Sequence, residues 1–409
     1  MANYFTYLCT DCGKIYDATE VRYLCPDCSA AQNPEMPPKG VLKVQYDYTA
    51  IKTAYPTFSE LKSRGFIDIL PIKSLSSFPR LSVGETPLYT YYKEELFPFA
   101  VALKDDSHNP TFSFKDRASA LVSAFAKENG LNTLVAASTG NAGSSLAGMC
   151  ASNEQKAIIM VPEKAPLAKL TQILMYGAKL VPVKGTYDDA FDLSIKATEA
   201  YGWYNRNTAF NPLTIEGKKT VSFEIYEQMQ GQLPDFIFVP TGDGVIISGV
   251  YKGFEDLLQL GIISKIPILV MVQSEGSDNL VQNISREHFE IKPSNTIADS
   301  ISVDIPRNFY MAKQFLLKYN GQTLCVSDDE ILEASKVLSK KTGIFSEPAA
   351  ATAFAGCMKY HQNGRIDSDQ KALVLLTGSG LKDLKSVQGI IEMPTSVESD
   401  LEQLNNYLQ

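Results

Sequence analysis

The chain has no excess of positive charge. Its 409 residues include 38 Lys and Arg against 46 Asp and Glu, which gives a formal net charge of −8. Proteins that bind the phosphate backbone of nucleic acids usually carry a strongly basic surface. The composition therefore argues against a nucleic-acid partner.

The chain also lacks a long hydrophobic run. The first 30 residues have no basic start leading into an apolar core, and no later run approaches the roughly 20 apolar residues needed to span a bilayer. We find no internal repeat and no low-complexity tract. We therefore expect a cytoplasmic protein without membrane contact, long enough at 409 residues for two domains with sizeable cores.

Four of the seven cysteines form two close pairs, Cys9-x2-Cys12 and Cys25-x2-Cys28, separated by twelve residues. Two such knuckles can close a tetrahedral site, so the spacing predicts a small zinc ribbon. Two disulfides are the weaker alternative in an intracellular chain. Because cysteines would supply all four ligands and leave no open position, the zinc would be structural. The other three cysteines are expected in the core: Cys150, Cys325 and Cys357.

Short apolar runs alternate with longer segments of helical spacing after a proline-rich joint at 33–40. The runs begin at residues 133, 157, 179, 235, 267 and 372. The helical segments include 140–154 and 327–343, the latter with Ser327 as a predicted cap. This alternation predicts an α/β fold of parallel sheets covered on both faces. The chain ends in a predicted polar helical tail.

Three turns rich in small polar residues follow predicted strands and are each placed to open a helix. They are STGNAGSS at 138–145, PTGDGVIISG at 240–249 and TGSGLKD at 377–383. Ligands gather at the carboxyl ends of parallel strands, and glycine lets helix-opening amides approach an anion closely. One such turn is as often tight packing as a ligand loop. Three of them together with a reactive lysine would form a binding site.

The candidate lysine is Lys115, in the stretch HNPTFSFKDRAS. It follows Phe112 and Phe114 and precedes the charged pair Asp116 and Arg117. A lysine kept partly out of water binds its proton less tightly, and the free amine is a nucleophile toward carbonyls. The alternative is an ordinary helix start in which Lys115 faces solvent and Asn109, Pro110 and Ser113 serve as turn and cap residues.

Pyridoxal phosphate (PLP) would use these features together. This cofactor needs a lysine for its aldehyde, a cradle for its phosphate and partners for its ring oxygen and ring nitrogen. Lys115 would hold the aldehyde, Asn141 the ring oxygen and Thr377 the ring nitrogen. A neutral threonine hydroxyl does not keep the ring nitrogen protonated, which suits elimination or replacement better than transamination. The phosphate cradle would be the amides of Thr241, Gly242, Asp243, Gly244, Val245 and Ile246.

From about Leu81 to Asp383 the chain resembles threonine synthase, a member of the fold-type II PLP enzymes that also include threonine dehydratase and the tryptophan synthase β chain. The similar segments begin with NPTFSFKDRA, STGNAGSSLA and VPTGDGVIISGVYKGF. They also include GETPL at 84, VPEKAPLAKLTQILMYGAKLVPVKGTYDDA at 161, NPLTIEGKKTVSFEI at 211, FSEPAAATAFAG at 345 and LTGSGLKD at 376. Some members of this family carry a similar pair of N-terminal cysteine knuckles.

The resemblance implies a two-domain α/β fold of fold type II, like the tryptophan synthase β chain, with a small N-terminal four-cysteine ribbon. It also implies a homodimer. The expected parts are a ribbon and joint at 1–40, a large PLP domain at 41–104 and 206–390, a small α/β domain at 105–205, and a polar tail at 391–409.

The activity implied is a lyase reaction of threonine biosynthesis, in which O-phosphohomoserine and water give threonine and phosphate through an aldimine on Lys115. Phosphate leaves the γ-carbon and water adds at the β-carbon. The substrate carboxylate would lie on the 138–142 loop at Ser138 and Thr139. Ser113 and Arg307 are further candidate substrate contacts.

Several positions depart from the family pattern. Phe112 stands where the family usually has glycine, and Ser379 replaces a histidine. Asp243, with the GVI that follows it, replaces a Gly-Asn-x-Gly-Asn loop; this aspartate would repel a phosphate unless it turns away or meets a cation. Asp304 and Arg307 stand in SISVDIPRN, where members often carry Arg-x-Gly-Asn-Pro. Lys164, Lys169 and Lys218 are other candidate phosphate clamps, although each alone is more typical of a solvated surface charge.

These departures favour a second hypothesis, a paralogue that performs β-elimination or β-replacement on another amino acid. Examples are serine, threonine or diaminopropionate ammonia-lyases and a cysteate-synthase-like enzyme. A third hypothesis is a noncatalytic protein that binds a ligand or partner. The presence of Lys115, Asn141 and Thr377 argues against this third hypothesis.

Overall fold

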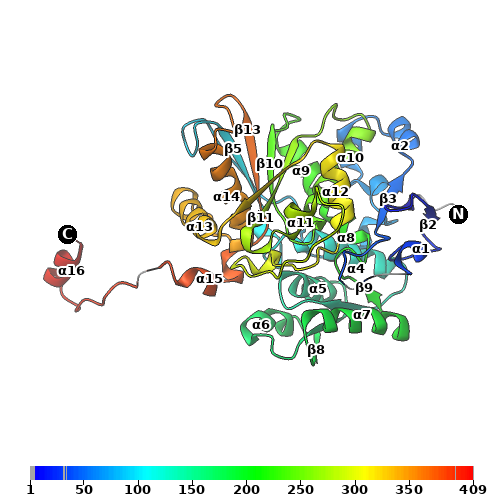
Figure 1. Ribbon diagram of the computed structural model, residues 1–409, viewed down its shortest axis with the longest axis horizontal. Helices are drawn as coiled ribbons and strands as arrows, with labels where there is room; N and C mark the ends of the chain where they lie inside the picture. Colours follow the sequence, from blue (N-terminus) through cyan, green and yellow to red (C-terminus); the bar gives the residue numbers. More distant parts are fainter. Residues whose placement is uncertain (1–4, 31–32, 34, 392, 409) are drawn as a thin grey trace.

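The computed structural model describes residues 5–30, 33, 35–391 and 393–408. Parts of the predicted segment 1–40, its joint at 33–40 and the predicted tail 391–409 therefore lie outside the described residues. The described chain is built on three sheets, of three, six and four strands (Figure 1).

The largest sheet has the strand order β12-β11-β10-β13-β5-β4. Its strands run parallel except β4, which pairs antiparallel with β5. The bounds are β4 Leu88–Tyr91, β5 Ala100–Asp105, β10 Phe236–Pro240, β11 Ile268–Ser274, β12 Gln322–Val326 and β13 Lys371–Leu376.

Both faces of this sheet are buried, because successive side chains of each strand enter different cores. In β10, Ile237 and Val239 pack on one side with helices α8, α9, α10 and α12. Phe236 and Phe238 pack on the other side with α13 and α14. A parallel sheet covered in this way requires nearly continuous apolar strands. This confirms the predicted α/β class.

The four-stranded sheet has the order β8-β7-β6-β9 and is parallel throughout. Its strands are β6 Thr133–Ala137, β7 Lys156–Pro162, β8 Lys179–Val183 and β9 Tyr204–Asn205. Helices α4 and α5 cover one face, and α7 covers the other. We call residues 133–205 the small lobe, and the six-stranded sheet with its helices the large lobe. The apolar runs predicted as strands at 133, 157, 179, 235, 267 and 372 are all confirmed.

The helices occupy the segments in which helical spacing was predicted. Helix α13 begins after Ser327, whose hydroxyl accepts the backbone N–H of Glu330, so the predicted cap is confirmed. The turn after β13, by contrast, opens a short 3-10 helix at Gly380–Lys382 and not an α-helix. The α-helices are α1 Pro26–Ser29, α2 Tyr48–Ala54, α3 Phe58–Ser63, α4 Lys115–Glu128, α5 Asn141–Ser152, α6 Leu167–Met175, α7 Tyr187–Tyr201, α8 Leu213–Lys218, α9 Thr220–Gln228, α10 Val245–Gln259, α11 Asn279–Asn283, α12 Phe309–Lys318, α13 Asp328–Thr342, α14 Pro348–Gln362, α15 Lys385–Gln388 and α16 Leu401–Leu408.

The N-terminal segment forms the three-stranded antiparallel sheet β2-β1-β3. Its strands are β1 Phe5–Cys9, β2 Ile15–Asp17 and β3 Leu42–Tyr46. Phe5, Tyr7 and Leu42 are buried in the same core as side chains of α4, α5 and β6. This segment is therefore packed on the small lobe.

Two of the three remaining cysteines lie in the core as predicted. Cys150 and Cys357 are buried, whereas Cys325 is only half-buried.

The predicted helical tail forms α16, which is exposed along its length and lies apart from the two lobes in Figure 1. Among the described helices, none has the length and apolarity needed to cross a membrane.

A network of buried charges joins the N-terminal segment to the large lobe. Lys219 contacts Asp256 at 2.7 Å and Glu216 at 2.5 Å, and Lys252 pairs with the same Asp256. The hydroxyl of Tyr46, in β3, donates to Glu216 at 2.6 Å. All five side chains are buried. Each charge is tolerated in the core because an opposite charge lies beside it.

Replacing Asp256 with Asn should leave Glu216 as the one carboxylate within salt-bridge distance of Lys219 and Lys252 among the described residues. Because breaking a buried ion pair from one side costs about 3–5 kcal/mol, we expect Asp256→Asn to lower the free energy of unfolding by that amount in urea titrations. Glu227→Gln, which breaks the exposed pair with Lys62, should cost less than about 1 kcal/mol. Equal losses in the two variants would contradict this view of the network.

Candidate active site

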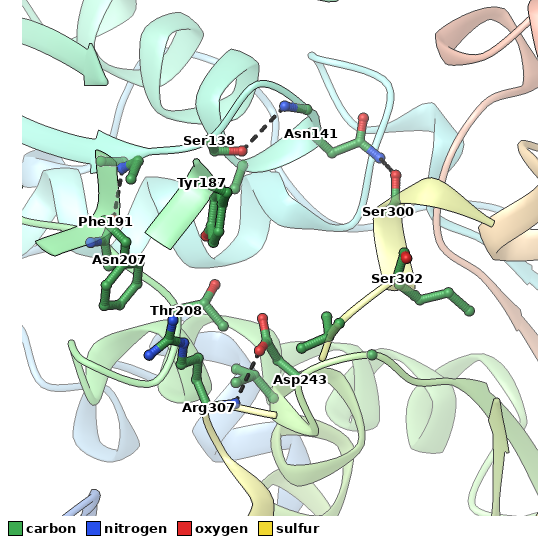
Figure 2. Close-up of a pocket in the computed structure, with 18 of the residues that line it drawn as sticks. Ser138, Asn141, Tyr187, Phe191, Asn207, Thr208, Asp243, Ser300, Ser302 and Arg307 are labelled. Atoms are coloured by element: carbon green, nitrogen blue, oxygen red, sulfur yellow. Dashed lines mark hydrogen bonds between the residues drawn. The ribbon is translucent and has the colours of Figure 1, made fainter. Parts of the chain in front are cut away.

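A cavity of about 540 Å³ lies between the two lobes. The walls come from the start of α4, the loops after β6 and β10, the start of α7 and the segment 299–307. Figure 2 shows Ser138 and Asn141 on the side of the small lobe, facing Asp243 and Arg307 on the side of the large lobe. The cavity is therefore at the carboxyl ends of parallel strands, where ligands of α/β proteins bind.

Lys115 is the first residue of α4 and lines this cavity. The predicted helix start is therefore present, but the side chain faces the cavity and not bulk solvent. Its amino group makes no hydrogen bond or ion pair with any described residue. Burial lowers the pKa of Lys115; nearby Arg206 lowers it further, whereas Glu347 and Asp243 oppose the shift. A lysine in this state can serve as a nucleophile.

The residues beside Lys115 fix its backbone. Asp116 accepts the backbone N–H of Thr111 at 2.6 Å. Arg117 is buried between Asp106 and Glu224 and contacts Asp106 at 2.6 Å. The two charges following Lys115 thus pair with other residues, not with each other, and they anchor the first turn of α4.

The loop before α10 leaves the opening amides of that helix without a side-chain cap. Gly244 has φ +85°, which only glycine adopts without strain, and a Cβ on Gly242 would lie 2.8 Å from the Cα of Ile301. The carboxylate of Asp243 accepts the backbone N–H of Arg307 at 3.1 Å. This hydrogen bond ties Asp243 to the segment before α12, while the residue still lines the cavity beside the helix-opening amides, which are the kind of group that binds anions.

The loop between β6 and α5 places Ser138, Thr139 and Asn141 on the cavity wall. The side-chain nitrogen of Asn141 donates to the carboxylate of Glu347 at 2.9 and 3.0 Å and to Ser300 at 3.3 Å. Glu347 is buried; burial raises its pKa, and the bonds from Asn141 and the charge of Lys115 act against that shift. Glu347 and Ser300 were not predicted as site residues. The only signal for Glu347 was an acid directly before Pro348, which begins α14.

Four predicted site residues lie outside the cavity lining: Ser113, Thr241, Gly244 and Thr377. Thr377 is buried, and its carbonyl accepts the N–H of Phe114 at 2.9 Å, which keeps it next to the turn that holds Lys115. The hydroxyl of Thr241 donates to the carbonyl of Val239 at 3.1 Å. The hydroxyl of Ser113 is buried without a hydrogen-bond partner in the structure.

The predicted anion clamps differ in their surroundings. Arg307 lines the cavity, but its guanidinium pairs with Asp188 and lies over the ring of Phe191, 4.6 Å from its centroid. Lys169 pairs with Asp299 at 2.8 Å, and Lys164 is exposed. Lys218 is buried and lines the cavity, so the interpretation of it as a solvated surface charge was wrong.

Other lining residues were not predicted as site residues, although Tyr187 and Ser302 lie in segments compared with the family pattern. They include Tyr187, Phe191, Asn207, Thr208 and Ser302, labelled in Figure 2. None of them lies in the three turns rich in small polar residues, and the fold brings them to the cavity.

The four N-terminal cysteines form a second candidate site. The sulfur atoms of Cys9, Cys12, Cys25 and Cys28 all lie within 4.8 Å of one another, and none of the four is in a disulfide. Four thiolates at such distances can surround one tetrahedral zinc ion. The predicted cluster is therefore formed, and its donor set fits zinc.

Comparison with known proteins places the fold and cavity in a family. Residues 79–378 match the family model described as "Pyridoxal-phosphate dependent enzyme". The chain is 36% identical to a threonine synthase of Methanocaldococcus jannaschii, over 98% of each chain. It is 33% identical to a threonine synthase of Methanosarcina acetivorans, over 96% of each chain.

A solved structure shows the same fold. The processed form of threonine deaminase isoform 2 from Solanum lycopersicum superposes with a TM-score of 0.63 at 22% identity, over 80% of this chain and 82% of that one. The chain therefore belongs to the pyridoxal-phosphate dependent enzymes of fold type II and, within them, to the threonine synthase family. It is a PLP-dependent enzyme, and the unpaired Lys115 and uncapped α10 amides fit that cofactor.

Phe112, which stands where the family usually has glycine, has φ +69° and is 47% exposed. The left-handed region costs a residue with a Cβ about 1–2 kcal/mol. We therefore expect Phe112→Gly to be more stable than Phe112→Ala by about 1 kcal/mol in urea unfolding, since both variants lose the ring and only alanine keeps the Cβ. Equal stability of the two variants would show that the backbone is unstrained at this position.

Proposed function

We propose that this enzyme converts O-phosphohomoserine and water to threonine and phosphate. The observation that carries the proposal is the placement of Lys115, an unpaired lysine of lowered pKa. It lies in a cavity whose other walls include the loop with Ser138, Thr139 and Asn141 and the uncapped amides of α10. Relatives named threonine synthase that match over 96–98% of the chain support the choice of substrate.

Each wall would have a distinct task. Bound PLP supplies an electron sink that stabilises negative charge on the substrate carbons. Lys115 would bind the aldehyde carbon and later move protons between substrate carbons. The amides of 241–246 would hold the cofactor phosphate, with Asn141 at the ring oxygen and Thr377 at the ring nitrogen. Ser138 and Thr139 would bind the substrate carboxylate, with Ser113 and Arg307 as further substrate contacts.

A second candidate function is β-elimination or β-replacement on another amino acid, as in serine, threonine or diaminopropionate ammonia-lyases or a cysteate-synthase-like enzyme. The observation that favours it is the pairing of Arg307 with Asp188, because an arginine already neutralised by a carboxylate is less able to clamp a substrate phosphate. The threonine synthase proposal needs Arg307 to exchange this exposed partner for the substrate.

The PLP-loaded enzyme should release threonine and phosphate from O-phosphohomoserine in equal amounts. Lys115→Arg should lower the rate by at least about a hundredfold, because the arginine guanidinium is neither a nucleophile nor a general base near neutral pH. Lys336→Met, an exposed position on α13, should leave the rate unchanged. The measurement follows both products in the same reaction.

Absence of both products from PLP-loaded enzyme would contradict the proposed substrate. The same enzyme would then be tested with serine, phosphoserine, diaminopropionate and threonine. Release of ammonia from one of these would establish the β-elimination form of the second candidate.

We further propose that Cys9, Cys12, Cys25 and Cys28 hold a structural zinc ion. Four sulfur atoms within 4.8 Å of one another support this, and the burial of the segment's strands against the small lobe gives the ion a structural task.

The enzyme is also proposed to be a cytoplasmic homodimer without a nucleic-acid partner. The division into domains 41–104 with 206–390 and 105–205 stays part of the proposal.

Purified enzyme should contain about one zinc ion per chain. Cys12→Ser should lose the metal and unfold at a lower temperature, because metal binding is coupled to folding of the segment. Cys325→Ser, at a half-buried cysteine outside the cluster, should keep the full zinc content. Reduced wild-type enzyme without zinc would refute the assignment.

A further inference from the structure

Two basic side chains in the cavity have no task in the proposed function. Arg206 follows β9, and Lys218 ends α8. Both line the cavity, and each residue is only 1% exposed. They come from separate elements, and both face the same cavity.

Neither side chain has an anionic partner. Arg206 donates from Nε to the Ser119 hydroxyl at 3.0 Å and from Nη1 to the Thr208 hydroxyl at 3.3 Å, while its Nη2 is buried without a partner. Lys218 donates only to the carbonyl of Thr214, at 3.2 Å. No carboxylate of the described residues lies within salt-bridge distance of either one.

The other buried basic groups of the described residues are paired. Lys104, Arg117, Lys219 and Lys252 each contact at least one carboxylate. An unpaired buried cation is costly, because water is lost and no charge replaces it. The two exceptions face the cavity, and an anion bound there would supply the missing charge.

The local electrostatics agree with this geometry. Burial lowers the pKa of Lys218 well below its ordinary value; Arg206 and Lys115 lower it further, and only Asp243 opposes them. Burial likewise lowers the pKa of Arg206 to about 10. Both groups are therefore less readily charged than usual until a negative ligand arrives.

Lys218 packs beside the start of α10, and this position indicates the size and charge of the anion that the cavity would bind. A Cβ built on Gly249 would lie 2.6 Å from the Cβ of Lys218, so this lysine packs on the first turns of α10. The uncapped amides of α10 open on the same cavity. Helix-opening amides together with two cations form a site for a compact, doubly charged anion.

We propose that Arg206 and Lys218 form a cation pair that binds a phosphate monoester dianion in the cavity. The inference rests on the proposed function in one respect, that both the cofactor and the proposed substrate carry this group. The packing of Lys218 against α10 favours the cofactor phosphate. A cation pair there would also offset Asp243, the acid that the sequence places in the phosphate loop.

The test compares affinity for PLP with affinity for pyridoxal, which lacks the phosphate. Lys218→Met removes the charge and keeps most of the aliphatic stem, and Lys218→Arg keeps a charge. If the pair holds the cofactor phosphate, Lys218→Met should bind PLP about tenfold or more weakly and pyridoxal as tightly as wild type. Lys218→Arg should keep most of the PLP affinity. Lys336→Met is the matched control and should change neither affinity.

A second arm separates the two phosphate sources. If Lys218→Met binds PLP normally but, once saturated with PLP, is inhibited about tenfold more weakly by inorganic phosphate, the pair serves the substrate phosphate. If both PLP affinity and phosphate inhibition are unchanged, the proposal is overturned. Lys218→Gln replaces Lys218→Met if that variant fails to fold. The first arm measures binding and needs no turnover. If Lys218→Met weakens PLP binding but the wild-type enzyme makes no threonine, only the proposed substrate is refuted.

Discussion

The cost of burying positive charge is the constraint on which this structure depends. Most of the chain meets it by pairing: Lys219 and Lys252 share Asp256, and Arg117 lies between Asp106 and Glu224. In the cavity, by contrast, the described residues supply no carboxylate in contact with the buried positive groups. Lys115, Arg206 and Lys218 face the same space without a carboxylate in contact, so the cavity suits a negatively charged ligand.

Helix α8 and Lys219, the residue after it, connect the cavity to the network of buried ion pairs. Lys218 faces the cavity, and its neighbour Lys219 faces the buried network that includes Tyr46 of the N-terminal sheet. The helix is held closely on both sides: a Cβ on Gly217 would lie 2.2 Å from the carbonyl oxygen of Arg117, and Gly249 leaves room for Lys218. The N-terminal segment and the wall of the cavity are thus parts of one packed unit. This gives the predicted zinc ribbon a physical connection to the site, although none of the ribbon's described residues lines the cavity.

The sequence predicts those features that local chemistry determines. The strand runs, the Ser327 cap, the four-cysteine cluster and the position of Lys115 at a helix start follow from spacing, capping and residue type, and the structure forms each of them. Sequence reasoning failed where tertiary packing decides. Lys218 and Lys219 are adjacent and look alike, yet one is paired and one is not, because of how α8 packs against α4 and α10. The contacts of Glu347 with Asn141 and of Arg307 with Asp188 join residues more than a hundred positions apart, which no local pattern reveals.

We propose that Lys115, and not the equally unusual Lys218, is the lysine that binds the cofactor carbonyl. Borohydride reduction of the PLP-loaded enzyme, followed by peptide mapping, tests this most directly, because reduction fixes the cofactor to the lysine that holds it. Our account predicts that the label is confined to the peptide containing Lys115. A label on Lys218, or no labelled peptide from enzyme shown to contain PLP, would contradict it.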